Sequence, residues 1–245
     1  MNSAFKSSSL EFRGGSSLQH PVRDFLVRFN AIFTLNQDIL LEHCYRGIAE
    51  GLVERSNPLT QRSWQIPGMR IQTLDDEHTY PAEAGLWVPT DERTIASVGQ
   101  PIFKLHGSSN WRTGHGSSVM ILGGGKIEAI ARFPVLRWYT DVFADRLSHA
   151  DARLMIIGYG FRDDHINTIL ELAIGRGLKV FVIDPRGADA GDTANRIPKD
   201  AIGYEPTRTQ EALMEGLIGA SQRWFSSTFS VDYVERQKVE RIFYG

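Results

Sequence analysis

Two polar residues of this sequence have side chains suited to chemistry. One is a histidine, which can act as a general base, and the other is an asparagine, whose amide can orient a ligand. Each lies at or just after the end of an apolar run. Asn36 comes directly after residues 31–35, and His106 lies near the end of residues 101–107. The ordinary pKa of histidine is close to neutrality, so His106 could accept a proton without a special environment. An amide can hold a water molecule or a hydroxyl without adding charge. The two residue types therefore suit a reaction that needs an aligned oxygen nucleophile and a base.

Each of these positions also has a structural interpretation. A histidine in a strand-end Leu-His-Gly is often a structural residue, and Asn36 and Asp38 can form a turn or cap a helix that begins near Ile39. Asp163 can likewise be a helix cap or a site residue. Capping and ligand contact are compatible, so both interpretations stay open for these residues.

The elements that would position these side chains are four apolar runs, which we predict to be buried strands. They are residues 31–35, 101–107, 153–158 and 179–185. Strands that are apolar throughout and alternate with helices indicate a parallel sheet covered by helices on both faces, that is, an α/β, Rossmann-like fold. Ligands bind such sheets beyond the carboxyl ends of the strands. The polar or glycine residues expected at these ends are Asn36 and Asp38, His106, Gly158 to Asp164, and Asp184.

The remaining pattern predicts helices, one hairpin and one irregular region. Helices are expected over residues 39–52, 136–150, 165–174 and 210–219, with Asp163 or Asp164 capping the third. Residues 119–122 and 127–131, joined by Gly123-Gly124-Gly125, are expected to form a hairpin. Four prolines punctuate residues 55–100, which we interpret as an irregular inserted excursion or small subdomain. We expect a flexible tail over residues 1–20 and a single domain over residues 21–245.

Composition excludes several classes of protein. The chain has 245 residues, 42% of them hydrophobic, and a formal net charge of -2, so bulk electrostatics do not favour direct binding of nucleic acid. No apolar run is long enough to span a membrane, and the first 15 residues have no apolar core of a secretory signal. Cys44 is the single cysteine, which excludes an internal disulfide and a multi-cysteine zinc site. We therefore expect a cytoplasmic protein.

Three segments stand in a fixed order along residues 31–185. The first is Thr34-Leu35-Asn36-Gln37-Asp38, the second is Lys-Leu-His-Gly-Ser-Ser-Asn-Trp over residues 104–111, and the third is Gly-Tyr-Gly-Phe-Arg-Asp-Asp-His-Ile-Asn over residues 158–167. A strand ending in Asp184-Pro185 follows. In this order they are similar to three sequence motifs of the sirtuin superfamily, namely Thr-x-Asn-x-Asp, Leu-His-Gly-Ser-x-x-Trp and Gly-Tyr-Ser/Gly-Phe-x-Asp-x-x-Ile-Asn. The chain resembles in particular the sirtuin-like domains of bacterial antiphage proteins.

The resemblance implies that the chain holds NAD, as substrate or ligand. It implies that His106 is the general base, that Asn36 positions a water or the ribose, and that Asp38 orients the nicotinamide side. The turn from Gly158 would let the backbone approach the phosphates or a ribose, and Asp184 would accept hydrogen bonds from the adenosine ribose. The full set of expected NAD-binding residues is Thr34, Asp38, Gly107, Gly158, Tyr159, Gly160, Phe161, Asp163, Asn167 and Asp184.

The sequence departs from the family in two respects. Protein-deacylating sirtuins carry four zinc-binding cysteines, and this chain has one cysteine, so we expect no zinc and favour the NAD-hydrolysing branch. The family also begins with a Gly-Ala-Gly-x-Ser loop that cradles the pyrophosphate. The nearest counterpart before Thr34 is residues 11–17, Glu-Phe-Arg-Gly-Gly-Ser-Ser, without a preceding apolar strand. We therefore expect a truncated or differently started gene product, or a degenerate member.

Two functions follow from these patterns. The first is an NAD hydrolase that releases nicotinamide and ADP-ribose, in an antiphage or stress setting. The second is a module that binds NAD or ADP-ribose, or a partner protein, without turnover; a homo-oligomer or a defence-system partner is compatible with either. A dehydrogenase is disfavoured, because no Gly-x-Gly-x-x-Gly follows a predicted strand.

Overall fold

The computed structural model describes residues 22–44, 64–72, 85–192, 195 and 197–244. The chain divides into two units, residues 1–141 and 142–245, and each is described by itself. The predicted tail over residues 1–20 lies outside the described residues. So do parts of the predicted helix 39–52 and of the irregular region 55–100.

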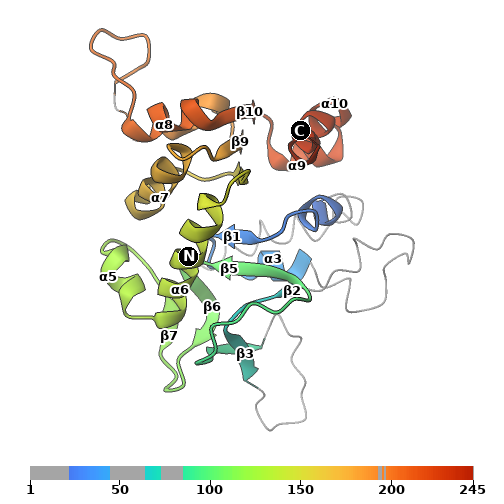
Figure 1. The fold of residues 1–245 in the computed structure, drawn as a ribbon, viewed down its shortest axis with the longest axis vertical. Helices are drawn as coiled ribbons and strands as arrows, with labels where there is room; N and C mark the ends of the chain where they lie inside the picture. The colour runs from blue at the N-terminus through green and yellow to red at the C-terminus, as the bar shows by residue number, and fades with distance from the viewer. Residues whose placement is uncertain (1–21, 45–63, 73–84, 193–194, 196, 245) are drawn as a thin grey trace, which may run out of the picture. The chain divides into compact units, whose positions relative to one another are not determined.

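A parallel sheet and a mixed sheet make up the first unit (Figure 1). The parallel sheet has the order β1 (Ile32–Thr34), β5 (Gln100–Lys104), β2 (Trp64–Gln65). The mixed sheet has the order β3 (Met69–Gln72), β4 (Leu86–Pro89), β6 (Gly107–Arg112), β7 (Ser118–Met120), in which β4 and β6 run parallel and the other pairs antiparallel. Its helices are residues 22–26, α3 (Leu40–Cys44), α5 (Lys126–Ala131) and the first part of α6 (Pro134–Ser148).

Aromatic packing fastens α6 to the parallel sheet of this unit. Phe103 of β5 stacks on Phe33 of β1, with ring centroids 4.8 Å apart, and meets Tyr139 of α6 edge-on at 5.0 Å. Aromatic pairs in these geometries stabilise a core beyond the area that they bury. Phe103 and Tyr139 are fully buried. The sheet that carries the predicted site residues is therefore well supported from one side.

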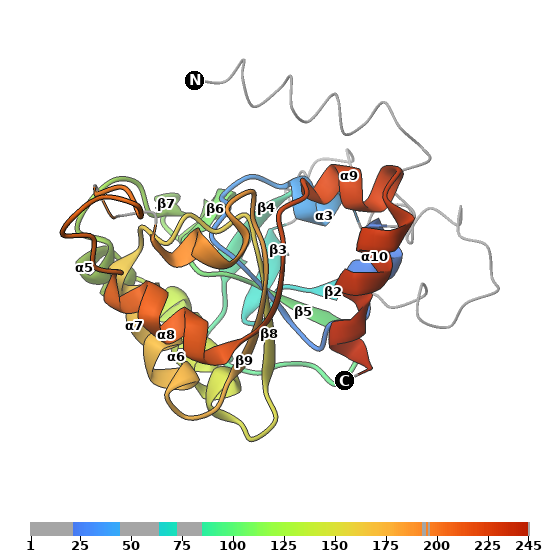
Figure 2. The same cartoon turned by 90° about the horizontal axis from the view of Figure 1, so that it is seen from above.

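The second unit is built on a three-stranded parallel sheet with helices on both faces. The sheet order is β10 (Leu217–Ser221), β9 (Lys179–Ile183), β8 (Arg153–Ile157). The other elements are the end of α6, α7 (Asp164–Ile174), the 3-10 helix η1 (Gly187–Asp192), α8 (Arg208–Gly216), α9 (Phe225–Ser230), α10 (Tyr233–Glu240) and η2 (Arg241–Phe243). Figure 2 shows α7 and α8 on one side of this sheet and α9 and α10 on the other.

These elements confirm the predicted fold class, a mixed α/β structure with parallel sheets flanked by helices. All four predicted strands are present, and the helices expected over residues 136–150 and 165–174 are α6 and α7. The predicted hairpin is wrong: residues 126–131 form α5, and β7 pairs instead with β6. Gly125 ends the glycine run at the N-cap of α5 with a left-handed backbone, φ of 66°, which glycine adopts without strain.

The helix expected over residues 210–219 ends early. Helix α8 stops at Gly216, and Leu217 to Ser221 form β10, which the sequence analysis did not foresee.

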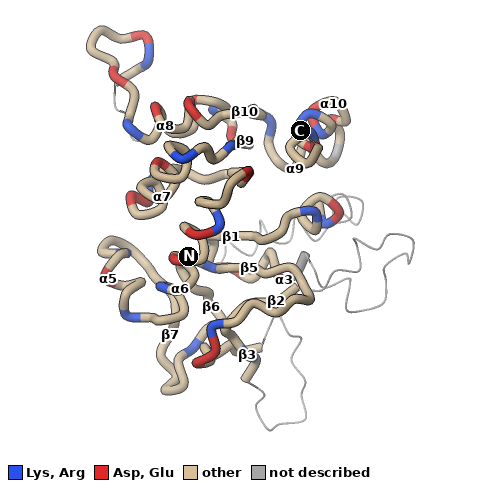
Figure 3. Tube along the Cα trace, viewed as in Figure 1, with Lys and Arg blue, Asp and Glu red and all other residues tan. Residues whose placement is uncertain are grey.

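Acidic and basic residues are interspersed in both units, consistent with the small net charge (Figure 3). Within the described ranges, no helix has the length and apolar character needed to cross a lipid bilayer.

Candidate functional site

The register of β1 against β5 places Asn36 and His106 at equivalent positions. The strands are parallel and pair Thr34 with Lys104, and the Leu105 N–H donates to the Thr34 carbonyl at 2.9 Å. Asn36 and His106 each lie two residues beyond these paired strand ends. Since parallel strands end at the same edge of a sheet, both side chains arise from one edge of the first unit. Figure 1 shows the two strands side by side.

The backbone between Asn36 and Asp38 is tied to the segment that follows His106. The Gln37 carbonyl accepts hydrogen bonds from the Ser109 N–H at 2.8 Å and from the Ser108 hydroxyl at 3.3 Å. The Gln37 side-chain amide donates to the Ile121 carbonyl, and the Ile121 N–H donates to the His106 carbonyl at 2.9 Å. The segments that carry Asn36 and His106 are therefore cross-linked by main-chain and side-chain bonds.

Asn36, Thr34 and Asp38 have different surroundings within this segment. The Thr34 hydroxyl accepts from the Asn36 N–H at 3.0 Å, and the Asp38 carboxylate accepts from the Leu40 N–H at 3.0 Å. Asp38 thus caps the start of α3, as the structural interpretation expected. The Asn36 side chain is exposed and, among the described residues, its amide has no hydrogen-bond partner. It is the member of the trio that can meet a ligand without breaking an internal bond.

His106 and Gly107 lie where β5 turns into β6. His106 is buried, with 4% of its surface exposed. Gly107 has φ of 75°, and a Cβ at this position would lie 2.1 Å from the Val119 carbonyl oxygen of β7. The glycine is therefore required by the close approach of two strands, which is a structural reason for the His-Gly pair.

A buried ion pair lies next to this segment. Lys104, the last residue of β5, donates from Nζ to Oε1 of Glu42 at 2.8 Å, and both side chains are 1% exposed. Lys104 also donates to the Asp38 carbonyl. The sequence analysis quoted Lys104, with Gln37, Ser108 and Ser109, inside the motif segments but gave them no role, and Glu42 lies outside those segments. The position of Lys104 two residues before His106 was the available signal.

The turn after β8 carries the second group of predicted residues. Gly158 has φ of 60° and donates from its N–H to the Ile183 carbonyl of β9 at 3.0 Å. A Cβ added at Gly158 or Gly160 would meet no heavy atom within 4 Å. Phe161 also has a positive φ, 52°, although its side chain is buried. The turn thus combines a constrained backbone with open space beside its glycines, as a close backbone approach to a ligand requires.

Tyr159, Asn167 and Asp163 hold this turn against α7. The Tyr159 hydroxyl donates to Oδ1 of Asn167 at 2.8 Å, and the Asn167 amide donates to the Phe161 carbonyl at 3.0 Å. Burial, with the nearby Asp163 charge, raises the pKa of Tyr159, so the hydroxyl stays protonated and can donate. Asp163 stands at the N-cap position of α7, and its carbonyl accepts from the Asn167 N–H at 2.9 Å. Asn167 of α7 therefore holds the turn in place through its hydrogen bonds to Tyr159 and Phe161.

Asp184 follows β9 and is buried, with 7% of its surface exposed. Its Oδ1 accepts from the Arg186 N–H at 2.9 Å and from Nε of Arg186 at 3.1 Å. The Asp184 N–H donates to the Ser221 carbonyl of β10 at 3.0 Å. The carboxylate is held in one orientation at the carboxyl end of β9, where the sequence analysis expected it.

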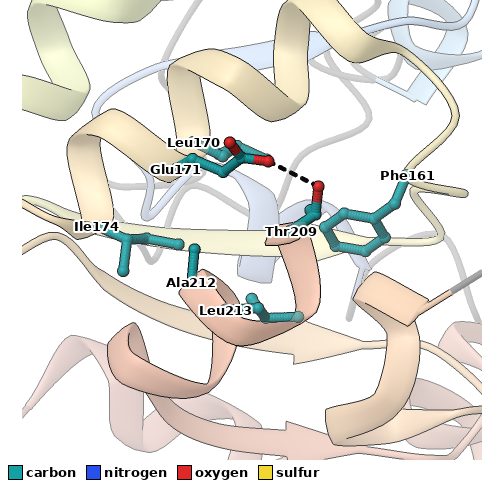
Figure 4. Close-up of a pocket in the computed structure, with 7 residues that line it drawn as sticks. All are labelled: Phe161, Leu170, Glu171, Ile174, Thr209, Ala212 and Leu213. Atoms are coloured by element: carbon teal, nitrogen blue, oxygen red, sulfur yellow. Dashed lines mark hydrogen bonds between the residues drawn. The ribbon is translucent and has the colours of Figure 1, made fainter. Parts of the chain in front are cut away.

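A seam between α7 and α8 is a packing contact. It is lined by Phe161, Leu170, Glu171, Ile174, Thr209, Ala212 and Leu213 (Figure 4). It has no room for a water molecule, and the Thr209 hydroxyl closes it by donating to Oε1 of Glu171 at 2.8 Å.

The structure thus sorts the predicted site residues into two sets. Thr34, Asn36, Asp38, His106 and Gly107 gather at the edge of β1 and β5 in the first unit. The others lie at the ends of β8 and β9 in the second unit and are Gly158, Tyr159, Gly160, Phe161, Asp163, Asn167 and Asp184.

Comparison with known proteins supplies the family. No curated protein matches the chain. The profile of the SIR2-like domain family matches residues 30–200, which contain both sets of site residues and most of the chain. With these motifs in order on an α/β scaffold, the protein belongs to the SIR2-like domain family.

Proposed function

We propose that this protein binds NAD and hydrolyses its nicotinamide–ribose bond, with His106 and Asn36 acting at the ribose. The observation that carries the proposal is the register of β1 against β5, which brings an exposed amide and a histidine to equivalent positions at one sheet edge. Membership in the SIR2-like family supports an NAD-related role.

The proposed reaction needs the protein to align water with the ribose and to supply a base. The bond from the nicotinamide nitrogen to C1′ of the ribose breaks, and nicotinamide leaves with the bonding electrons as a neutral molecule. C1′ develops oxocarbenium character, as in glycoside cleavage. A water oxygen then bonds to C1′, and we assign the acceptance of its proton to His106. Asn36 would hold the water or the ribose hydroxyl through its unengaged amide.

For the residues of the second unit, we propose the NAD-binding roles that the family resemblance implies. The open side of Gly158 and Gly160 would admit a phosphate or ribose close to the backbone, with Tyr159 and Asn167 keeping the turn in shape. Asp184 would accept hydrogen bonds from the adenosine ribose hydroxyls, with Arg186 orienting its carboxylate. Asp38 would orient the nicotinamide side.

The test is nicotinamide release from NAD by the purified chain and by His106→Ala and Asn36→Ala. We expect His106→Ala to lower the rate by roughly 10²–10⁴-fold, the usual contribution of acid–base catalysis. Asn36→Ala should also lower the rate, because the water or the ribose loses its alignment. His115→Ala is the matched control, because His115 is an exposed histidine in the turn between β6 and β7 of the same unit. Equal rates in all four proteins would contradict the assignment.

Binding without turnover is the second candidate, and the internal engagement of the Asp184 carboxylate and the Asn167 amide favours it. Saturable binding of NAD or ADP-ribose, measured by calorimetry, with no nicotinamide release would support this function. Absence of both binding and release would leave a scaffold role toward a partner protein.

We place the reaction in the cytoplasm of a bacterial cell that responds to phage, where loss of NAD would halt growth. The resemblance of the three motifs to antiphage sirtuin-like domains motivates this setting. Cellular NAD should fall after infection when the wild-type chain is present and stay constant with His106→Ala. A constant NAD level in both would argue against the defence role.

A further inference from the structure

The ion pair between Lys104 and Glu42 is the most completely buried charged pair among the described residues, and the proposed chemistry does not use it. Both side chains are 1% exposed, and Nζ of Lys104 lies 2.8 Å from Oε1 of Glu42. The second carboxylate oxygen of Glu42 has no hydrogen-bond partner in the described part of the chain. Burying two charges is costly, and replacing such a pair by apolar residues is often neutral or stabilising. Stability alone is therefore a weak reason for its presence.

The second hydrogen-bond partner of the Lys104 ammonium indicates what the ion pair does. Besides Glu42, its ammonium donates to the main-chain carbonyl of Asp38. Lys104 ends β5, and its register partner is Thr34 at the end of β1. The ammonium therefore reaches from one strand end across to the segment that leaves the neighbouring strand. It fixes the carbonyl two residues after Asn36.

The same segment is anchored from its other side. The Gln37 carbonyl accepts from the Ser109 N–H at 2.8 Å, so adjacent carbonyls of Gln37 and Asp38 are both held. Between the Thr34 hydroxyl bond and these two anchors, the backbone of Asn36 has little freedom. Its exposed side chain is the part left to meet a ligand.

We propose that Lys104 is a positioning residue, which holds the Asp38 carbonyl and so orients the Asn36 amide toward the ligand, while Glu42 keeps its charge compensated. The inference rests on the proposed function for the identity of the reaction. The anchoring itself does not depend on turnover.

The test compares Glu42→Gln with the double variant Lys104→Met/Glu42→Gln. The single variant keeps the ammonium donor and offers it an amide oxygen. The double variant removes the donor without leaving a buried carboxylate unpaired, which the single change Lys104→Met would do. If the double variant does not fold, Lys104→Gln/Glu42→Gln replaces it, since the shorter amide cannot reach as far.

Amide hydrogen exchange measures how firmly the segment of Gln37 and Asp38 is held, and it needs no ligand. We expect the Ser109 N–H, which donates to Gln37, to exchange at least about tenfold faster in the double variant than in Glu42→Gln. The Leu105 N–H, which donates to Thr34, should stay equally protected in both and reports that the strand pair is intact. Equal protection of Ser109 in the two variants would overturn the proposal.

Nicotinamide release then links anchoring to catalysis. We expect kcat of the double variant to be on the order of 10–100-fold below that of Glu42→Gln at unchanged KM, because a misplaced catalytic group costs rate. Lys199→Met, which removes an exposed ion pair with Asp189 in the second unit, is the control with unchanged kinetics. Equal kcat in the two Glu42 variants overturns the catalytic part. Absence of release from the wild type refutes the proposed function, and hydrogen exchange alone then decides the anchoring role.

Discussion

Two glycines of the family motifs serve different purposes at the residue scale. Both Gly107 and Gly158 have a left-handed backbone, with φ of 75° and 60°. A Cβ at Gly107 would overlap the Val119 carbonyl oxygen, whereas a Cβ at Gly158 would meet open space. Gly107 is therefore needed for folding, and Gly158 leaves its backbone accessible. A motif glycine implies a conformation, and its surroundings decide whether that conformation serves packing or a ligand.

Gly107→Ala should destabilise the protein by more than roughly 2 kcal/mol, through backbone strain and the overlap with β7. Chemical denaturation checks this value. Gly114→Ala is the control in the same hairpin, since a Cβ there meets nothing within 4 Å, and it should change stability by less than about 0.5 kcal/mol. Similar losses in both variants would contradict the packing role.

Tyr159 should make the protein less stable in alkali. Burial raises its pKa above the ordinary value, so the folded state keeps a proton that the unfolded chain releases from about pH 10 upward. The contribution is fully present below that pH and is lost as pH rises further.

Urea unfolding at increasing alkaline pH should therefore show a shallower loss of stability for Tyr159→Phe than for the wild type. Tyr233→Phe changes an exposed tyrosine of α10 and is the control. Identical slopes for Tyr159→Phe and the wild type would show that burial of Tyr159 does not govern its titration.

At the element scale, small residues at the junction of α8 and β10 let a helix pass directly into a strand of the second unit's parallel sheet. A Cβ at Gly216 would lie 2.9 Å from both Cγ2 of Ile174 and the Leu178 carbonyl oxygen. A Cβ at Gly219 would lie 2.6 Å from the Phe181 ring of β9. The junction is therefore packed against α7 and β9 at backbone distance, which aligns β10 to support the carboxyl end of β9 and Asp184.

Gly216→Ala should overpack this junction and cost about 1–3 kcal/mol. Gly175→Ala, at the end of α7, is the matched control because its φ is -59° and its nearest neighbour would be 3.4 Å away. Thermal unfolding of the two variants checks the difference. A lower midpoint for Gly175→Ala than for Gly216→Ala would refute this account.

At the scale of the whole molecule, α6 joins the two units as one continuous helix. The boundary falls after Asp141, inside Pro134–Ser148. Leu136 and Tyr139 are buried before the boundary, and Phe143 and Leu147 are buried after it. Both halves of α6 therefore carry buried apolar side chains, and we expect them to form and unfold as one helix.

Calorimetry should consequently show a single transition in which calorimetric and van't Hoff enthalpies agree. This is the outcome expected of the single domain predicted over residues 21–245. Two resolved transitions, or a calorimetric enthalpy well above the van't Hoff value, would show that the units unfold independently.

Adding NAD at about 100 times its Kd should raise stability by roughly 2.7 kcal/mol if the folded state alone binds it.

The sequence by itself determined the fold class, the four site-bearing strands and the order of the motifs. Apolar runs such as 179–183 leave few alternatives to a buried strand, because burial is set by residue type along a short stretch. The motif residues follow these apolar runs directly in the sequence, so the sequence also places them at the ends of the strands. Asp38 as the cap of α3 was predicted as one of two open interpretations, and it is the bond to Leu40 that shows the cap.

Tertiary structure decided what depends on partners distant in sequence. Strand β7 pairs with β6, and residues 127–131, which were expected to pair with it, form α5. The link between Lys104, Glu42 and the Asp38 carbonyl joins positions more than 60 residues apart, and no local pattern encodes it. Whether a motif residue bonds to an internal partner or has open space beside it was decided in the same way, as the bonds of Asn167 and the open side of Gly158 show.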